Sequence, residues 1–193
     1  MRMTLGKTFY NIRTDYRAIA DLMGMKMNFF RVIFLFFCPS IMAITLYRFS
    51  HYFYSNKIKP LAWILWQFNI YLTGADILPN CVIGEYFYIG HSTGTVLAAK
   101  FGSNVKVFGQ ACIGGGMGSE DRGAGPGLPV IGDNVRIGFR SLILGPVVIG
   151  NGATIGPMTF VNKSVPENAT AVGNPCKILR GPDAAGSEKA QAA

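Results

Sequence analysis

A six-residue period governs the sequence from about residue 74 onward and limits what this part can fold into. Every sixth residue from Ile77 to Ile113 is apolar except Thr95, and after an interruption the series resumes in the same frame from Ile131 to Val161. A glycine often follows these positions, and a small or β-branched residue often stands two places before them. An α-helix repeats near 3.6 residues and a strand at 2, so neither explains this period.

A three-sided coil does explain it. Three short strands per turn, one on each face, would put one large side chain of every hexad inside, stacked on its counterpart one turn away. The small residue would fill the corner, and glycine would allow the bend. We therefore expect a mainly β domain over residues 73–181, a parallel β-helix of hexapeptide repeats.

The interruption between Ile113 and Ile131 predicts a loop. Its sequence, GGGMGSEDRGAGPGLPV, is too rich in glycine and charge to form wall strands. Because the frame resumes in phase, we expect an extended loop at about residues 114–128, inserted on a preserved helix. Loops on a rigid scaffold often carry function.

The first 72 residues lack the six-residue period. In DYRAIADLMG, SIMAITLYRFSHYFY and PLAWILWQFNIYL, apolar residues are spaced by three and four, which predicts an α-helical head over residues 1–72. Pro39 and Pro60 stand where helices could begin. The last segment, residues 182–193, has little to bury and is expected to be a flexible tail.

The head is both basic and rich in apolar and aromatic residues. Residues 1–60 hold nine Lys or Arg and two acids, a net of +7 out of the chain's +8, and residues 1–72 hold 17 of the 24 aromatics. This composition is typical of an element on an anionic membrane surface, whereas the greasy run leaves no open basic face for nucleic acid. Between Arg31 and Arg48 there are 16 uncharged residues, and a spanning helix needs about 20. Interfacial attachment, packing within the head or between subunits, and a true span all stay open.

The cysteines predict a reducing environment. Cys38, Cys81, Cys112 and Cys176 form no CxxC pair, so we expect small apolar residues in a cytoplasmic protein, with peripheral attachment to the inner face of the cytoplasmic membrane as a further possibility. Scattered cysteines and two histidines do not predict a metal site.

Four segments resemble serine acetyltransferase-type hexapeptide acyltransferases over about residues 38–181. GHSTG is similar to the catalytic D-H-[AG]-T-G of that family, ACIGGG with EDRG to its glycine run and Asp-Arg loop, and SVPENATAVGNPCKI to its closing motif. LYRFSHYFY with PLAWILWQFNIYLTGADILP is similar to the last helices of its head. The resemblance implies a left-handed β-helix, acetyl-CoA as co-substrate, no metal, and a homotrimer or a higher assembly.

His91, inside GHSTG, is the predicted catalytic residue. An imidazole titrates near neutrality and suits a general base. The resemblance implies that His91 takes the proton of an acceptor hydroxyl and passes it to the departing thiolate of coenzyme A. It also implies a pairing with Asp76. The alternative that this carboxylate only begins the first coil, without contacting His91, stays open. Cys112 is not favoured as a nucleophile, and His51 is expected to be structural.

Further residues are predicted to hold the two substrates. Backbone groups of a glycine loop suit a developing oxyanion and a thioester arm. The predicted coenzyme-binding residues are Gly114, Gly115, Gly116, Phe139, Arg140, Met158 and Lys177. Asp121 and Arg122 are predicted to contact the acceptor, and a solvated pair in the loop is the alternative.

Three departures from the family pattern bear on the acceptor. Gly90 stands where the family often has Asp, and Leu128 precedes Pro129 where serine-specific members have a histidine. Bulky pairs, Phe139-Arg140 and Pro157-Met158, replace the usual Ala-Gly pairs. We therefore expect an O-acetyltransferase acting on a sugar of a membrane-linked glycan or exopolysaccharide precursor. Serine O-acetylation towards cysteine, a longer acyl donor and a non-catalytic β-helical scaffold are the alternatives.

Overall fold

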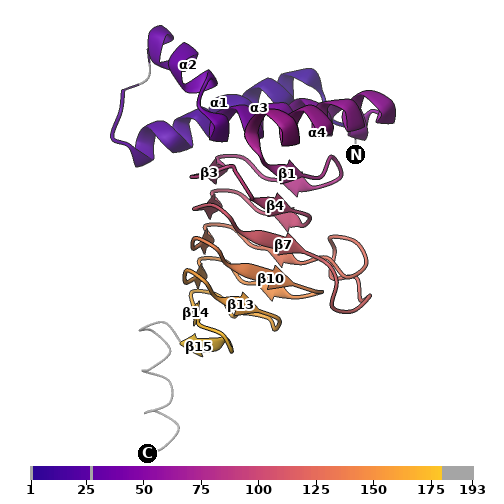
Figure 1. Ribbon diagram of the computed structural model, residues 1–193, viewed down its shortest axis with the longest axis vertical. Coiled ribbons are helices and arrows are strands. Elements are labelled where there is room, and N and C mark those ends of the chain that lie inside the picture. The colour runs from indigo at the N-terminus through magenta and orange to yellow at the C-terminus, as the bar shows by residue number, and fades with distance from the viewer. Residues whose placement is uncertain (1, 27, 180–193) are drawn as a thin grey trace, which may run out of the picture.

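A helical head sits on one end of a three-sided β prism (Figure 1). The structure is a computed structural model that describes residues 2–26 and 28–179; the predicted tail at 182–193 lies outside this range. The head contains α1 (Leu5–Leu22), α2 (Phe29–Phe36), α3 (Pro39–Ser55) and α4 (Lys59–Thr73). Pro39 and Pro60 lie in the first turns of α3 and α4, as predicted, where a missing N–H breaks no helical hydrogen bond.

Short strands form the walls of the prism. They are β1 (Asp76–Ile77), β2 (Val82–Ile83), β3 (Tyr88–Ile89), β4 (Val96–Leu97), β5 (Lys100–Phe101), β6 (Lys106–Val107), β7 (Cys112–Gly114), β8 (Val130–Ile131), β9 (Arg136–Ile137), β10 (Leu142–Leu144), β11 (Val148–Ile149), β12 (Thr154–Ile155), β13 (Phe160–Val161), β14 (Thr170–Val172) and β15 (Lys177–Leu179). Their orders are β1-β4-β7-β10-β13, β11-β8-β5-β2 and β15-β14-β12-β9-β6-β3. The pairs are parallel except β14 with β15, so the predicted left-handed parallel β-helix is confirmed.

The core of the prism is a stack of inward side chains, one from each strand except β15. Each is at most 5 % exposed, so it leaves water almost completely, which is the main source of stability in such a fold. The first sheet stacks Ile77, Leu97, Ile113, Ile143 and Val161; the second stacks Ile83, Phe101, Ile131 and Ile149; the third stacks Ile89, Val107, Ile137, Ile155 and Ala171.

Thr95, the exception in the apolar series, is not an inward residue of the walls, although a strict period of six would put it there. Leu97, rather than Thr95, fills the inward slot of the first sheet and pairs with Ile77. Thr95 instead lies two residues before Leu97, at the position where small side chains recur, and it is fully buried. Its hydroxyl donates to the carbonyl of His91 and accepts from the N–H of Gln110, both at 2.9 Å. A hydroxyl with two backbone partners is stable in this corner. An aliphatic side chain would leave the carbonyl of His91 and the N–H of Gln110 without these bonds.

The interruption is an insertion on a preserved helix, as predicted. Ile113 of β7 pairs with Ile143 of β10 across the inserted residues, so the register of the walls continues beyond them. The loop between β7 and β8 projects from the edge of the first sheet (Figure 1). It is therefore an insertion that extends from the wall, and it does not interrupt the prism.

A buried ion pair joins the head to the first coil. Arg48 of α3 donates to both carboxylate oxygens of Asp15 of α1, at 2.8 and 3.0 Å. The same guanidinium donates to the carbonyls of Ile83 and Gly84, both at 2.6 Å, and Asp15 accepts from the N–H of Phe87 at 2.9 Å. Both charges are thus compensated without water, and two helices are fixed to one turn of the prism.

In the part of the chain that the structure describes, no single helix has the length and apolar character needed to cross a membrane. Phe30–Phe36 and Pro39–Ser55 together meet those criteria, but they are bent by 83° relative to each other.

Candidate active site

His91 lies in the corner between β3 and β4. The corner is tied to the end of α4, because the hydroxyl of Ser92 donates to the carbonyl of Thr73 and the N–H of Gly94 donates to the carbonyl of Gly74, both at 2.9 Å. The imidazole is exposed, and its ring meets the ring of Phe139 edge-on, with centroids 5.9 Å apart. The bonds to the end of α4 and the ring of Phe139 thus position the imidazole at the surface, where a substrate can reach it.

Gly109 lies against the backbone and Cβ of His91. A Cβ atom at Gly109 would lie 2.7 Å from the Cβ of His91 and 2.9 Å from its carbonyl oxygen. Its φ of +129° is also a conformation that other residues rarely adopt. The histidine can keep its position only because no side chain is present here.

A groove of about 510 Å³ is lined by residues of the third sheet and its corner. Phe139, the residue in contact with His91, is part of its wall. Arg136 is the cation in its lining, and most other groups there are apolar or backbone. The full lining is Phe108, Arg136, Gly138, Phe139, Thr154, Ile155, Gly156 and Pro157.

A second groove, of about 430 Å³, lies around the neighbouring Arg140 and Met158. Arg140 is fixed here, because its Nε donates to the side-chain oxygen of Gln110 at 2.7 Å and its guanidinium lies over the ring of Phe139 at 5.6 Å. Three predicted coenzyme-binding residues, Phe139, Arg140 and Met158, are thus gathered at one corner with His91.

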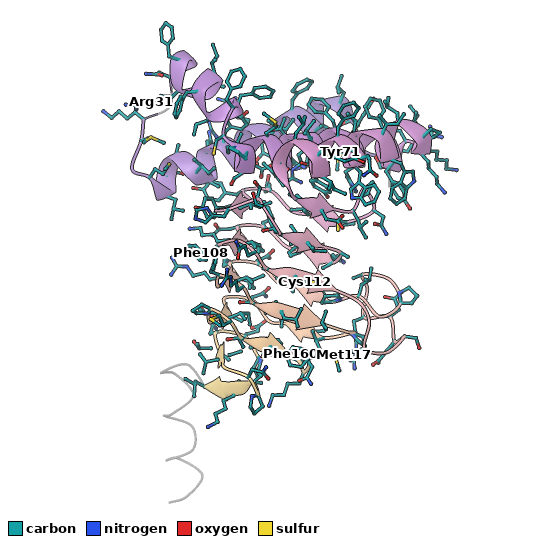
Figure 2. All side chains as sticks on the ribbon, viewed as in Figure 1. Arg31, Tyr71, Phe108, Cys112, Met117 and Phe160 are labelled. Atoms are coloured by element: carbon teal, nitrogen blue, oxygen red, sulfur yellow. The ribbon has the colours of Figure 1, made fainter. Side chains whose placement is uncertain are left out.

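The predicted glycine loop lies elsewhere. Gly114 ends β7 at the far edge of the first sheet, near Ala98, and Gly115 and Gly116 lead into the loop. Figure 2 places Phe108, which lines the groove, and Met117 of the loop at opposite edges of the prism. A single chain therefore does not bring the glycine run to His91. Lys177 is also apart, in β15 at the last rung.

Asp121 and Arg122 are both occupied within the loop. The carboxylate of Asp121 accepts from the N–H groups of Gly123 and Gly125, at 2.7 and 3.0 Å, and these bonds hold its pKa below the usual value. Arg122 forms an exposed ion pair with Glu120 at 2.9 Å. This geometry agrees with the alternative of a solvated pair, and their contact with an acceptor stays a prediction.

Asp76 has a partner that the sequence did not reveal. The indole Nε1 of Trp66 in α4 donates to its Oδ1 at 2.8 Å. Among the hydrogen bonds of the described residues, none joins Asp76 to His91, so their pairing stays a prediction. Cys112 faces outward in the same sheet, and burial, together with the charge of Asp76, raises the pKa of its thiol. A raised pKa disfavours the thiolate that a nucleophile needs.

Sequence reasoning missed several residues of this corner. Gly109 follows His91 by one eighteen-residue turn, so the coil spacing itself could have found it. Arg136 and Phe108 could have been found as outward neighbours of inward aliphatics. Trp66 carried no such signal. Within the described range, no group of three or more His, Cys, Asp and Glu side chains could hold a metal ion.

A prism of hexapeptide turns with an exposed histidine beside a groove defines the class of hexapeptide acyltransferases. A sequence profile for the family "Bacterial transferase hexapeptide (six repeats)" matches residues 129–163. The serine acetyltransferase of Bacillus pumilus is 32% identical over 173 residues, which are 89% of this chain and 77% of that protein. The chain belongs to the serine acetyltransferase family.

Solved structures agree with this placement. The serine acetyltransferase of Neisseria gonorrhoeae in complex with serine superposes with a TM-score of 0.77 and 31% identity, covering 89% of this chain and 69% of that one. A serine acetyltransferase in complex with CoA gives a TM-score of 0.77 and 25% identity, covering 91% and 71%.

Proposed function

We propose that the chain acetylates the hydroxyl of serine, with His91 as the general base. The chain is a CoA-dependent O-acetyltransferase, and relatives with its fold bear the name serine acetyltransferase. Their structures include complexes with serine and with CoA. The observation that carries the proposal is the exposed imidazole of His91, whose ring meets Phe139 in the wall of the groove.

The geometry suits direct transfer. His91 takes the proton of the acceptor hydroxyl while the hydroxyl oxygen bonds to the thioester carbon. The carbon–sulfur bond then breaks, and His91 returns the proton to the sulfur. Each proton and electron pair is accounted for without a covalent enzyme intermediate. Asp76 would fix the tautomer of the imidazole, and the indole of Trp66 would hold that carboxylate in place.

The groove beside His91 suits an acyl-CoA arm. Phe108 and Phe139 supply apolar wall for the pantetheine chain. Arg136 lines the same groove, and Arg140 is exposed at its corner, so both guanidinium groups could meet phosphates. Gly138 and Gly156 also line this groove.

The separation of the two halves of the site supports a homotrimer. His91 and the groove lie at one edge of the first sheet, whereas Gly115, Gly116 and the loop lie at the other. Among the hydrogen bonds of the described residues, none uses the N–H of Gly115 or Gly116. Prisms that stand side by side would bring the loop of one copy to the groove of the next, with those donors available for the thioester oxygen.

A sugar hydroxyl is the second candidate acceptor. The comparisons support serine better than the membrane-linked glycan expected from the sequence. Leu128 nevertheless precedes Pro129 where serine-specific members were expected to have a histidine that grips the amino acid. An uncharged sugar acceptor would not need that histidine, so a sugar hydroxyl is tested beside serine.

An acceptor screen distinguishes these functions. Purified protein is given acetyl-CoA, and thiol release is measured with serine, with nucleotide sugars and with lipid-linked sugars. We expect release with serine, and His91→Ala should lower kcat by about 10²–10⁴-fold without loss of folding, because general-base catalysis is worth about that much. Release only with a sugar would replace serine by the second candidate. No release with any acceptor, and no effect of His91→Ala, would support a scaffold.

A further inference from the structure

Helix α2 turns an apolar face away from the protein. Phe30, Ile33, Phe34 and Phe37 recur at spacings of three and four, so they share one side of the helix. They are 80, 45, 76 and 68 % exposed. Leu35, on another side, is buried against α1 and α3. A helix at the surface of a globular domain normally points its apolar side inward, so this reversed arrangement indicates an external apolar contact.

The head is basic, and three of its cations lie on or near α2: Lys26 precedes the helix, Arg31 lies in its first turn, and Arg13 lines a groove together with Val32 and Phe36. In the described head, the exposed cations are Arg2, Lys7, Arg13, Arg17, Lys26, Arg31, Lys57 and Lys59. The two acids of residues 2–60 are both engaged: Asp15 is buried against Arg48, and Asp21 accepts from the hydroxyl of Tyr86. The head therefore presents a positive field with little negative charge to offset it.

A mostly apolar groove lies next to the exposed apolar face of α2. It has a volume of about 420 Å³, lies between α1, α2 and α3, and has Arg13 as its one charged lining group. Its lining is Phe9, Ile12, Arg13, Tyr16, Val32, Phe36, Thr45 and Phe49. Figure 1 shows α2 on the side of the head remote from the prism.

We propose that α2 docks the protein on an anionic lipid bilayer. Phe30, Phe34 and Phe37 enter the boundary between headgroups and acyl chains, while Lys26 and Arg31 contact lipid phosphates. Because α2 faces away from the prism, the groove beside His91 stays open to solution. The docking does not depend on which hydroxyl is acetylated.

Charge favours lipid over a second copy of the chain on this face. Two heads that met through α2 would bring their cations together, and like charges across a contact cost free energy. Anionic headgroups complement the same cations. The short α2 also suits an interfacial position, since its eight residues are far fewer than the roughly 20 that cross a bilayer.

The test is sedimentation of the full chain with vesicles. One set is phosphatidylcholine alone, and the other contains phosphatidylglycerol as well. We expect binding to the anionic set, weaker in about 0.5 M salt because screening shortens the reach of surface charges. Phe34→Ser/Phe37→Ser should weaken binding at least about tenfold, since each phenylalanine loses its buried area. Lys26→Glu/Arg31→Glu should also weaken it.

Val82→Ser is the matched control, because Val82 is an exposed apolar residue of the prism. It should bind vesicles like the unchanged protein, and thiol release in solution should be equal in all variants, which shows that they are folded. Equal sedimentation with both vesicle sets, none with either, or full binding by Phe34→Ser/Phe37→Ser would overturn the proposal. Self-association without lipid that this double variant abolishes would assign the face to a second copy instead.

Discussion

At the scale of single residues, the position of His91 depends on a neighbour without a side chain. Gly109 stands one turn further along the prism, and its backbone runs directly under the histidine. The imidazole can therefore reach over this glycine to Phe139. The position of the proposed base is set as much by the absence of a methyl group at residue 109 as by the histidine itself.

Gly109→Ala should displace His91. The new Cβ would lie 2.7 Å from that of His91, and the positive φ adds strain of about 1–3 kcal/mol. We expect kcat for thiol release to fall by about 10²-fold, as expected for a misplacement near 1 Å, and the melting temperature to fall as well. Gly6→Ala is the control, because a Cβ there meets nothing within 4 Å. Equal kcat in both variants would contradict this role.

Sequence reasoning predicted part of this corner. His91 could be predicted because its motif is local in sequence, and Phe139 and Arg140 because they follow an inward aliphatic. Thr95 was misplaced because a strict period of six cannot reveal a slip of two residues. The bond from Trp66 to Asp76 joins a helix to a strand, and no periodic rule relates two such elements.

At the scale of elements, α3 is attached to the first coil by a half-buried histidine. Nδ1 of His51 lies 3.0 Å from the carbonyl oxygen of Pro79, so this nitrogen carries the proton of the neutral ring. Burial lowers the pKa of His51, and the nearby charge of Arg48 acts in the same direction. The expected structural role of this residue agrees with these contacts.

The stability of the protein should therefore fall in mild acid. Unfolded His51 binds a proton as the pH drops through about 6.5, whereas the folded ring does so only at lower pH. Protonation then favours the unfolded state, so the contribution is complete above about 6.5 and is lost below it. In melting curves across this window, His51→Asn, which keeps a donor to Pro79, should lose less stability than the unchanged protein. Tyr71→Phe should keep the original slope, and an unchanged slope in His51→Asn would refute the idea.

The boundaries of elements followed from local chemistry where that chemistry was distinctive. Pro39 and Pro60 marked two helix starts, and Gly74 ends α4 in the left-handed conformation that suits glycine. The position of α2 could not be foreseen, because its apolar face does not pack on the core. A sequence pattern reveals that a face is apolar, but it cannot tell which partner covers it.

At the scale of the whole molecule, the head and the prism are joined both by apolar packing, since Ala43, Ile44 and Tyr47 of α3 belong to the hydrophobic cluster of the prism, and by a buried ion pair. Asp15 and Arg48 are both buried, and their hydrogen bonds reach α1, α3 and the first coil. The sequence predicted both parts but not the joint, because the two residues are 33 positions apart and lie on different helices. Only the folded arrangement brings them together.

Asp15→Ala should loosen the head from the prism. The change leaves the guanidinium of Arg48 buried without its counter-charge, which typically costs about 3–5 kcal/mol. Denaturant titration should show that loss in the free energy of unfolding. Lys7→Ala removes an exposed pair with Glu85 and should have a much smaller effect. Similar losses in the two variants would show that the buried pair does not join the parts.

The misplaced threonine has a wider consequence for the catalytic corner. Ile77 and Leu97 are twenty positions apart, but Leu97 and Ile113 are only sixteen apart, so the longer turn is cancelled by a shorter one immediately afterwards. The change of register is therefore confined to the bend that bears His91, and the walls before and after it stay in step.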